Sequence, residues 1–303
     1  MNISDTLKGS LYALVAVVSV SNVYIFSKAA LQETSISQFG VYWFGFGLLW
    51  ILLFAFYKRA YPLFRILEKK DLLIMLVLGL FDVGSTFFFF KAIATISDPT
   101  IVSFIGNISP ALAITLSIIV LKEKFNLLEV IGVTLALSGA FIISYKGNID
   151  FSNLFIKGSE YVLYGALISS FNSVVIKKNI KRIPPVVLTV NRTFFLLTFS
   201  LLTLLYLQKG FSIPTTALKN IFIGSILGPF LTVIAGYLAL QYIPLSLKSI
   251  FGSTKGLFVL IGSYIYFGNF PSKIALLGGL VSIIGVLLIT LGKIKLKKKR
   301  QVE

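Results

Sequence analysis

The chain contains one apolar pattern twice, as LLEVIGVTLALSGAFIISY at residues 127–145 and as KIALLGGLVSIIGVLLITL at residues 273–291. In each segment two glycines stand seven residues apart: Gly132 and Gly139, then Gly278 and Gly285. Each segment is close to the roughly 20 apolar residues that a helix needs to cross a bilayer. The pair therefore predicts two membrane helices that occupy the same place in two copies of a larger unit.

The whole chain is as apolar as these two segments. Of 303 residues, 56% are hydrophobic and only 13% are charged, and the mean hydropathy is +0.92. These values are typical of integral membrane proteins and exclude an ordinary soluble domain. Because hydrocarbon offers no water to backbone polar groups, every span should be a helix. The sequence predicts an all-α membrane protein with ten transmembrane helices, at residues 8–30, 37–57, 72–95, 98–121, 127–145, 160–178, 185–207, 219–242, 245–267 and 273–292.

The repeat extends beyond the glycine segments. A shift of 146 residues aligns the third to fifth spans with the eighth to tenth and pairs Thr86 with Thr232, while Lys8-Gly9-Ser10 recurs as Lys157-Gly158-Ser159. Each unit holds five spans, and an odd number makes the second unit enter the membrane from the opposite side. We therefore expect two inverted five-helix repeats, an arrangement found in many transporters. The expected bounds are 1–146 for the first repeat, 157–292 for the second and 293–303 for a basic cytoplasmic tail.

Basic residues are distributed unevenly between alternate connections. With the N-terminus inside, 18 Lys and Arg residues fall on the inner side and six on the outer side. The positive-inside rule therefore places both termini in the cytoplasm, for a multi-pass protein of the cell (inner) membrane. The run Lys297-Lys298-Lys299-Arg300 is interpreted as a stop-transfer anchor at the lipid surface and not as a nucleic-acid site.

Short motifs follow one another in a recognisable order: Ser21-Asn22 in the first span, Ser109-Pro110 in the fourth, Leu121-Lys122-Glu123-Lys124 at its end, and Gly132 and Gly139 in the fifth. With these motifs the whole chain resembles the drug/metabolite transporter superfamily, of the EamA type. The resemblance implies two five-helix repeats and efflux as the commoner direction. The stretch Lys255-Gly256-Leu257-Phe258 is also similar to the ninth helix of triose-phosphate and nucleotide-sugar transporters, where a basic residue contacts the substrate phosphate. Gly256 stands where the triose-phosphate branch has a second basic residue.

Charged residues inside the spans are the main candidates for a solute site. A charge at the bilayer centre costs roughly 2.5 to 3.5 kcal/mol, so such residues usually face a watery cavity or each other. At a rise of about 1.5 Å per residue, Asp82, Arg192 and Lys255 lie near the middle of the membrane. We expect them to line one cavity, with a structural pair involving Asp82 as the competing interpretation. Lys91 and Lys248 lie nearer to helix ends, where solute binding and snorkelling to the interface explain them equally well.

Amides and helix breakers add further candidates. Asn22 and Asn107 lie at membrane depth, where they either hydrogen-bond a solute or join helices. Pro110 of the fourth span aligns with Gly256 of the ninth, and Pro229 interrupts the eighth. Breakers at equivalent depth in both halves point to a substrate site because they shape a cavity and free backbone carbonyls. An ordinary proline kink is the alternative.

Pairs of glycines at GxxxG spacing predict close helix contacts. Gly224 and Gly228 form one pair and Gly252 and Gly256 another. Like the glycines of the fifth and tenth spans, these pairs let backbones approach closely in lipid.

Two residue types that are absent from the chain exclude several classes of functional site. The chain has no Cys and no His, so thiolate sites, the commonest metal ligand and the usual base of a nucleophile triad are absent. No cofactor is expected, no phosphate-binding loop for ATP is present, and these residues argue against a membrane-embedded enzyme. The leading hypothesis is a secondary transporter, in the export direction, of a small and anionic organic metabolite by alternating access, with proton coupling through Asp82. An exporter of amino acids or drug-like solutes and a flippase for lipids or amphiphiles remain open, as does the oligomeric state.

Overall fold

The structure, a computed structural model, describes residues 3–64, 67–109, 111–112, 115–116, 127–144, 156–268 and 270–302. Every regular element in these residues is a helix. The first half contains α1 (Ile3–Leu31), α2 (Ile36–Tyr57), the short 3-10 helix η1 (Tyr61–Phe64), α3 (Lys69–Thr95), α4 (Pro99–Ile105) and α6 (Leu127–Ser144). The second half contains α7 (Ser159–Asn179), α8 (Pro185–Tyr206), α9 (Thr215–Ser225), the π-helical segment η3 (Ile226–Thr232), α10 (Val233–Tyr242), α11 (Leu245–Ser253), α12 (Lys255–Phe267) and α13 (Lys273–Val302).

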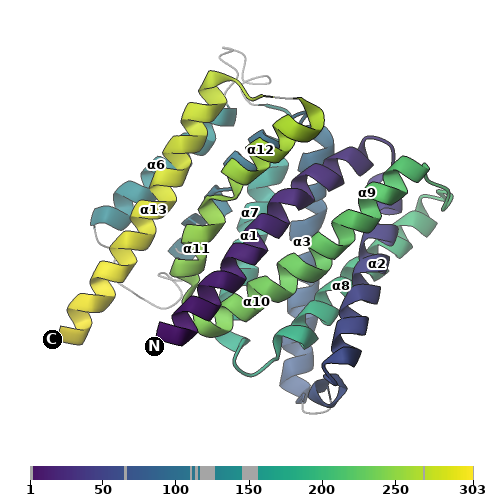
Figure 1. The fold of residues 1–303 in the computed structure, drawn as a ribbon, viewed down its shortest axis with the longest axis horizontal. Coiled ribbons are helices and arrows are strands. Elements are labelled where there is room, and N and C mark those ends of the chain that lie inside the picture. The colour runs from purple at the N-terminus through teal and green to yellow at the C-terminus, as the bar shows by residue number, and fades with distance from the viewer. Residues whose placement is uncertain are drawn as a thin grey trace.

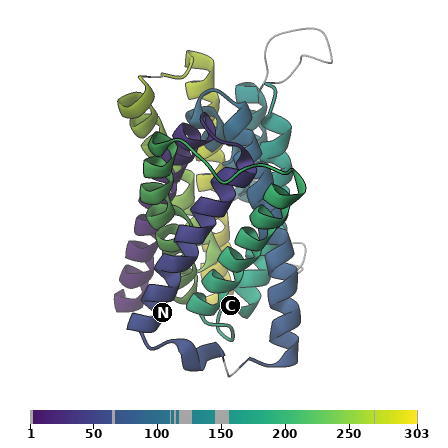
Figure 2. The same cartoon turned by 90° about the vertical axis from the view of Figure 1, so that its right-hand side faces the viewer.

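The helices form one bundle, and two perpendicular views place both termini at the same end of it (Figures 1 and 2). The described residues contain helix in each of the ten predicted segments, with α9, η3 and α10 together forming the eighth and α11 and α12 the ninth. Five helices of the described part are long and apolar enough to cross a membrane by length and composition. The predicted all-α fold with ten transmembrane helices is thus confirmed. α13 continues to Val302, so the segment predicted as a basic tail extends the last helix.

The two halves repeat one backbone plan. Helices α2 and α8 have equal lengths of 22 residues and begin and end 149 residues apart. Each is followed by a residue in the left-handed region, Arg59 with φ 49° and Gln208 with φ 51°. The packing is reciprocal, because α1 packs against α10 as α7 packs against α3, while α2 packs against α8 and α6 against α13. Equivalent helices therefore exchange places as a pseudo-two-fold axis requires.

The crossing of α6 and α13 shows the sense of this symmetry. A Cβ added at Gly132 would lie 2.6 Å from the carbonyl oxygen of Gly285, and one added at Gly285 would lie 2.6 Å from that of Gly132. Gly139 likewise meets Gly278. The contacts advance along one helix while they retreat along the other, so these equivalent helices are antiparallel and the repeats are inverted. The predicted close packing of the four glycines is confirmed.

The glycines of the other two pairs behave differently from one another. A Cβ at Gly228 would lie 2.7 Å from Trp43, and Gly224 packs on the same indole. A Cβ at Gly256 would lie 2.5 Å from the Phe104 ring, whereas one at Gly252 would meet nothing within 4 Å. Among the described residues the prediction of a close contact is therefore wrong for Gly252, because the helix is interrupted at Thr254 and the two glycines lie on different helices, α11 and α12.

Two equivalent lysines hold the ends of helices. The buried Lys28 Nζ donates to the carbonyl oxygens of Ile93 at 2.9 Å and Ile96 at 2.7 Å, at the C-terminal end of α3. Lys177, 149 residues later, donates to those of Leu240 at 2.7 Å and Ile243 at 3.1 Å, at the C-terminal end of α10. Each ammonium supplies donors to carbonyls that have no partner further along their own helix. The first helix of each half is thereby tied to the third.

Helix interruptions lie where the fourth and ninth spans meet. α4 ends at Ile105, and α11 ends at Ser253 before α12 begins. The Asn107 Nδ2 donates to the carbonyl oxygen of Ser253 at 3.5 Å, across the two interruptions. The eighth span is interrupted as well, with Pro229 inside η3. Pro110 and Leu121-Lys122-Glu123-Lys124 lie outside the described residues.

Candidate solute-binding cavity

A central cavity of about 360 Å³ lies between the two halves. Its wall is formed by residues of α1, α2, α3, α4, α7, α8, η3, α10, α11 and α12, together with Gly106 and Ser109 after α4. The described residues of α6 and α13 are absent from this wall. The volume is near the lower end of the range of about 300 to 1,000 Å³ for small-molecule sites.

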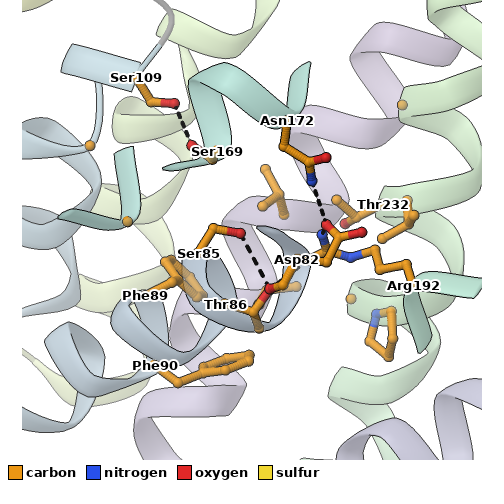
Figure 3. A pocket seen from close by; sticks show the side chains of 18 of the residues that line it. Asp82, Ser85, Thr86, Phe89, Phe90, Ser109, Ser169, Asn172, Arg192 and Thr232 are labelled. Atoms are coloured by element: carbon orange, nitrogen blue, oxygen red, sulfur yellow. Dashed lines mark hydrogen bonds and ion pairs between the residues drawn. The ribbon is translucent and has the colours of Figure 1, made fainter. Parts of the chain in front are cut away.

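A polar cluster around Asp82 forms one part of the wall (Figure 3). The Asp82 carboxylate, on α3, is paired with Arg192 of α8 and accepts a hydrogen bond of 2.8 Å from Asn172 Nδ2 of α7. Arg192 Nη2 also donates to Thr86 Oγ1 at 2.9 Å. Asp82 is only 1% exposed, and two helices of the other half supply its partners, because Arg192 of α8 balances its charge and Asn172 of α7 donates a hydrogen bond. The cluster therefore joins the two halves beside the cavity.

Two further cations line the cavity. Lys255 Nζ lies 3.4 Å from the carbonyl oxygen of Gly106, and Lys248 Nζ lies beside Gly236. Within the described part of the chain, neither lysine has a carboxylate within ion-pair distance. Because Arg192 already neutralises Asp82, the wall carries two lysines that no acid on it balances. The cavity is thus suited to negative charge.

The structure brings together four of the seven predicted site residues, namely Asp82, Arg192, Lys248 and Lys255. The pairing partner of Asp82 is Arg192, and Lys255 stands apart from that pair. Whether these residues bind a solute stays a prediction.

The other three predicted site residues do not lie on the described cavity wall. Lys91 Nζ lies 6.0 Å from the centre of the Tyr161 ring, and Asn22 Nδ2 donates to Val18 of its own helix at 2.9 Å. Asn107 is fully buried at the helix interruptions. Depth in the membrane was the reason for predicting all three, but depth does not decide which side of the chain faces the cavity.

Several lining residues are absent from the sequence-based candidates for the site, among them Ser169, Ser173 and Tyr237. Asn172 and Ser173 follow Ser169 at the three- and four-residue spacing of one helix face. Ser169 Oγ lies 2.9 Å from Ser109 Oγ. The polar stripe of the sixth span was the sequence signal that marked the two serines.

Aromatic rings form another part of the wall. The ring centres of Tyr24 and Phe89 are 5.0 Å apart, as are those of Phe89 and Phe90. Trp43 and Phe44 of α2 continue the surface, with centres 5.9 Å and 6.2 Å from that of Phe90. All five side chains line the cavity. Three helices of the first half thereby present one continuous ring surface.

Comparisons with known proteins agree with this architecture. The model of the EamA-like transporter family matches the chain twice, at residues 7–145 and 156–291. The uncharacterized transporter sll1164 of Synechocystis sp. is 24% identical over 218 residues, which cover 68% of this chain and 61% of that relative. A solved crystal structure, described only as that of a protein, superposes with a TM-score of 0.67 over 96% of this chain and 98% of its own, at 17% identity, and supports the fold alone.

Both family matches together span most of the chain, and the family is one of transporters and not of enzymes. Transporters built from inverted repeats bind their solutes near the middle of the membrane, at the interface of the repeats. The chain is a multi-pass membrane protein that belongs to the EamA-like transporter family.

Proposed function

We propose that the chain is a secondary transporter that exports a small organic anion by alternating access. The observation that carries the proposal is the charge of the cavity wall, which holds Arg192, Lys248 and Lys255 against one acid, Asp82. Since Arg192 and Asp82 form a pair, the two lysines remain for the solute. A charge kept at membrane depth needs water, a ligand or a partner, and an anionic solute supplies the missing partner.

The inverted repeats support the mechanism. Two similar halves exchange conformations and open one central site to either side. The Asp82 cluster joins α3 of the first half to α7 and α8 of the second, so a change in its contacts is coupled to the relative position of the halves. Asp82 is also the acid of the wall through which proton coupling would pass.

Substitution of the cavity lysines tests the proposal. Purified protein in proteoliposomes is assayed for uptake of radiolabelled organic acids, first as wild type and then as Lys248→Gln and Lys255→Gln. Lys91→Gln is the matched control, because Lys91 is a membrane-helix lysine away from the cavity wall. We expect each cavity variant to reduce uptake at least about tenfold, the effect of losing roughly 1.4 kcal/mol of binding, and the control to leave it unchanged.

Two results would contradict the proposal. One is unchanged uptake by folded Lys248→Gln and Lys255→Gln proteins. The other is a wild-type protein that accepts neutral or cationic solutes as well as acids. Measuring the melting temperature of each variant separates a loss of transport from a loss of folded protein.

Export requires a defined orientation, and we propose that both termini lie in the cytoplasm. The support is the excess of basic residues on the side of the termini, 18 against six. Because the chain lacks native Cys, a single cysteine at Lys58 or Lys209 can be labelled directly. An impermeant reagent added to cells should label position 209 and spare position 58, and the reverse pattern would overturn the orientation.

A further inference from the structure

The polar and apolar parts of the cavity wall are separated along the membrane depth. On α3 the lining residues run from Asp82 and Thr86 to Phe89 and Phe90 in the direction of the chain. Figure 3 shows the charged cluster on one side and the two phenylalanine rings on the other. At a rise of about 1.5 Å per residue, seven residues from Asp82 to Phe89 correspond to about 10 Å. This is a separation that one small molecule can span.

Helix α7 repeats the separation in the opposite chain direction. Its lining residues begin with Val162 and Ala166, continue with the polar Ser169, Asn172 and Ser173, and end with Ile176. The two helices are antiparallel, since Asn172 bonds to Asp82 while the ring of Tyr164 lies 5.4 Å from that of Phe88. The polar groups around Asp82 and Asn172 therefore lie at one depth of the cavity, and Phe89, Phe90 and Val162 lie at another.

The apolar end is largely aromatic. Tyr24, Trp43, Phe44, Phe89 and Phe90 form its continuous ring surface. Aromatic faces and edges favour other rings by about 0.5 to 1.5 kcal/mol beyond the burial of their area. A solute that consisted of charged groups alone would leave this surface in contact with water. A solute with a ring would cover it.

We propose that the cavity selects an amphipathic organic anion, with its anionic group at Lys255 and an aromatic ring on the surface of Tyr24, Phe89 and Phe90. The inference rests on the proposed function, since it adds a second recognition element to the same anion site. The lysines select solutes with a negative charge, and the aromatic rings select, among these, solutes that carry a ring. Small carboxylates without a ring are poor ligands of this cavity.

Three matched probes test the inference on purified full-length protein by isothermal titration calorimetry. Phenylacetate has both features, acetate lacks the ring, and phenylacetamide has the ring without the charge. We expect phenylacetate to bind at least about tenfold more tightly than either of the others, because burial of a ring exceeds the effect of one or two methylene groups. Lys255→Gln should weaken the binding of both anions.

A conservative variant assigns the selectivity to the ring surface. Phe89→Leu keeps an apolar side chain and should lower the ratio of phenylacetate to acetate affinity by at least about threefold while acetate affinity is unchanged. Phe87→Leu is the control on the same helix, because Phe87 is 36% exposed and is not part of the wall. It should leave the ratio unchanged.

The outcomes distinguish this inference from the proposed function. Equal affinity for acetate and phenylacetate in the wild type overturns the ring site and leaves the anion site standing. Equal affinity for phenylacetamide and phenylacetate overturns the anion site and with it the proposed function, as does the failure of every probe to bind. An unchanged ratio in Phe89→Leu refutes the assignment to this surface.

Discussion

The polar cluster of the cavity and its symmetry mate have opposite chemistry. Asp82, Asn172 and Arg192 form the cluster, whereas the equivalent positions, at shifts of 146 and 149 residues, hold Gly228, Val23 and Trp43. The three residues of each set line the cavity and lie close to one another. A Cβ at Gly228 would lie 2.7 Å from Trp43 and 3.1 Å from Val23, so the three apolar positions meet as the three polar ones do.

This difference separates what the fold needs from what the solute needs. The shared helix bounds of α2 and α8 and the shared left-handed residues after them show that the two halves have an equivalent backbone at these helices. The two walls differ in their side chains and in one backbone feature, because α3 is a continuous α-helix where the equivalent span contains the π-helical η3. Alternating access depends on the shared backbone, while charge selectivity in our proposal depends on the wall that differs. Substitutions at equivalent positions should therefore change the stability of the protein unequally at the polar cluster and its apolar counterpart, and equally where the two halves are alike.

The largest effect is expected at the polar cluster. Arg192→Gln leaves the buried carboxylate of Asp82 without its cation and should destabilise the protein by about 3 kcal/mol, as loss of one partner of a buried pair does. The melting temperature in detergent measures this. Adding Asp82→Asn should restore much of the loss, because no buried charge then remains. As a control, Lys70→Gln breaks a pair whose side chains are 60% and 63% exposed, and it should cost less than about 0.5 kcal/mol. A double variant no better than Arg192→Gln would show that the pair is not coupled.

At the equivalent apolar positions, stability should depend on the volume of the side chains and not on their charge. Gly228→Ala places a methyl group 2.7 Å from the Trp43 ring and should cost about 1 to 3 kcal/mol through overpacking. Combined with Trp43→Phe, the loss should be smaller than the sum of the single losses. Gly252→Ala, which meets nothing within 4 Å, is the control and should be neutral or slightly stabilising. Thermal unfolding of the four proteins checks this, and a neutral Gly228→Ala would show that the wall at this point is not tightly packed.

Equivalent threonines give a finer test. Thr86 accepts a hydrogen bond from Arg192, whereas Thr232 donates to the carbonyl oxygen of Leu227 in its own helical segment at 2.7 Å. Thr86→Val removes a bond to a charged group and should cost about 1.5 kcal/mol. Thr232→Val should cost less than about 0.5 kcal/mol. Equal melting temperatures for the two variants would argue that Thr86 contributes nothing to the cluster.

The smallest effects should also be equal. Arg59 and Gln208 adopt φ angles of 49° and 51°, which favour glycine. Arg59→Gly and Gln208→Gly should each change the free energy of unfolding by less than about 1 kcal/mol and in the same direction, since relief of backbone strain is offset by the added entropy of the unfolded chain. Chemical denaturation in detergent compares them. Opposite signs would count against an equivalent backbone in the two halves.

Most of the fold could be predicted from hydrophobic segments and from the repeat. Membrane helices are set by the length of apolar stretches, so the predicted segments coincide closely with the helices of the structure wherever the whole segment is described. The paired glycines predicted contacts because only residues without side chains let backbones approach as Gly132 and Gly285 do. Gly252 has the same spacing and no such contact. The spacing of four residues identifies one helix face only where the helix is continuous, and it is interrupted between Gly252 and Gly256.

The candidate site could be predicted only in part, for a related reason. Counting residues from a helix end gives the depth of a side chain in the membrane, and depth selected Asp82, Arg192 and Lys255 for the cavity. The direction in which a side chain points depends on the helices around it. Lys91 and Lys248 have similar depth, yet one lies beside Tyr161 and the other lines the cavity. For the same reason the sequence did not predict that Arg192, and not Lys255, would be the partner of Asp82.

The crossing of α6 and α13 should keep a constant distance between these two helices. Backbone meets backbone at Gly132, Gly139, Gly278 and Gly285, so no side chain can change its rotamer to absorb a slide of one helix along the other. The described residues of both helices are also absent from the cavity wall. Spectroscopic labels placed on this pair should report one separation in every state of the transport cycle. Displacements of α3, α7 and α8 can then be calibrated against that fixed length in the same sample.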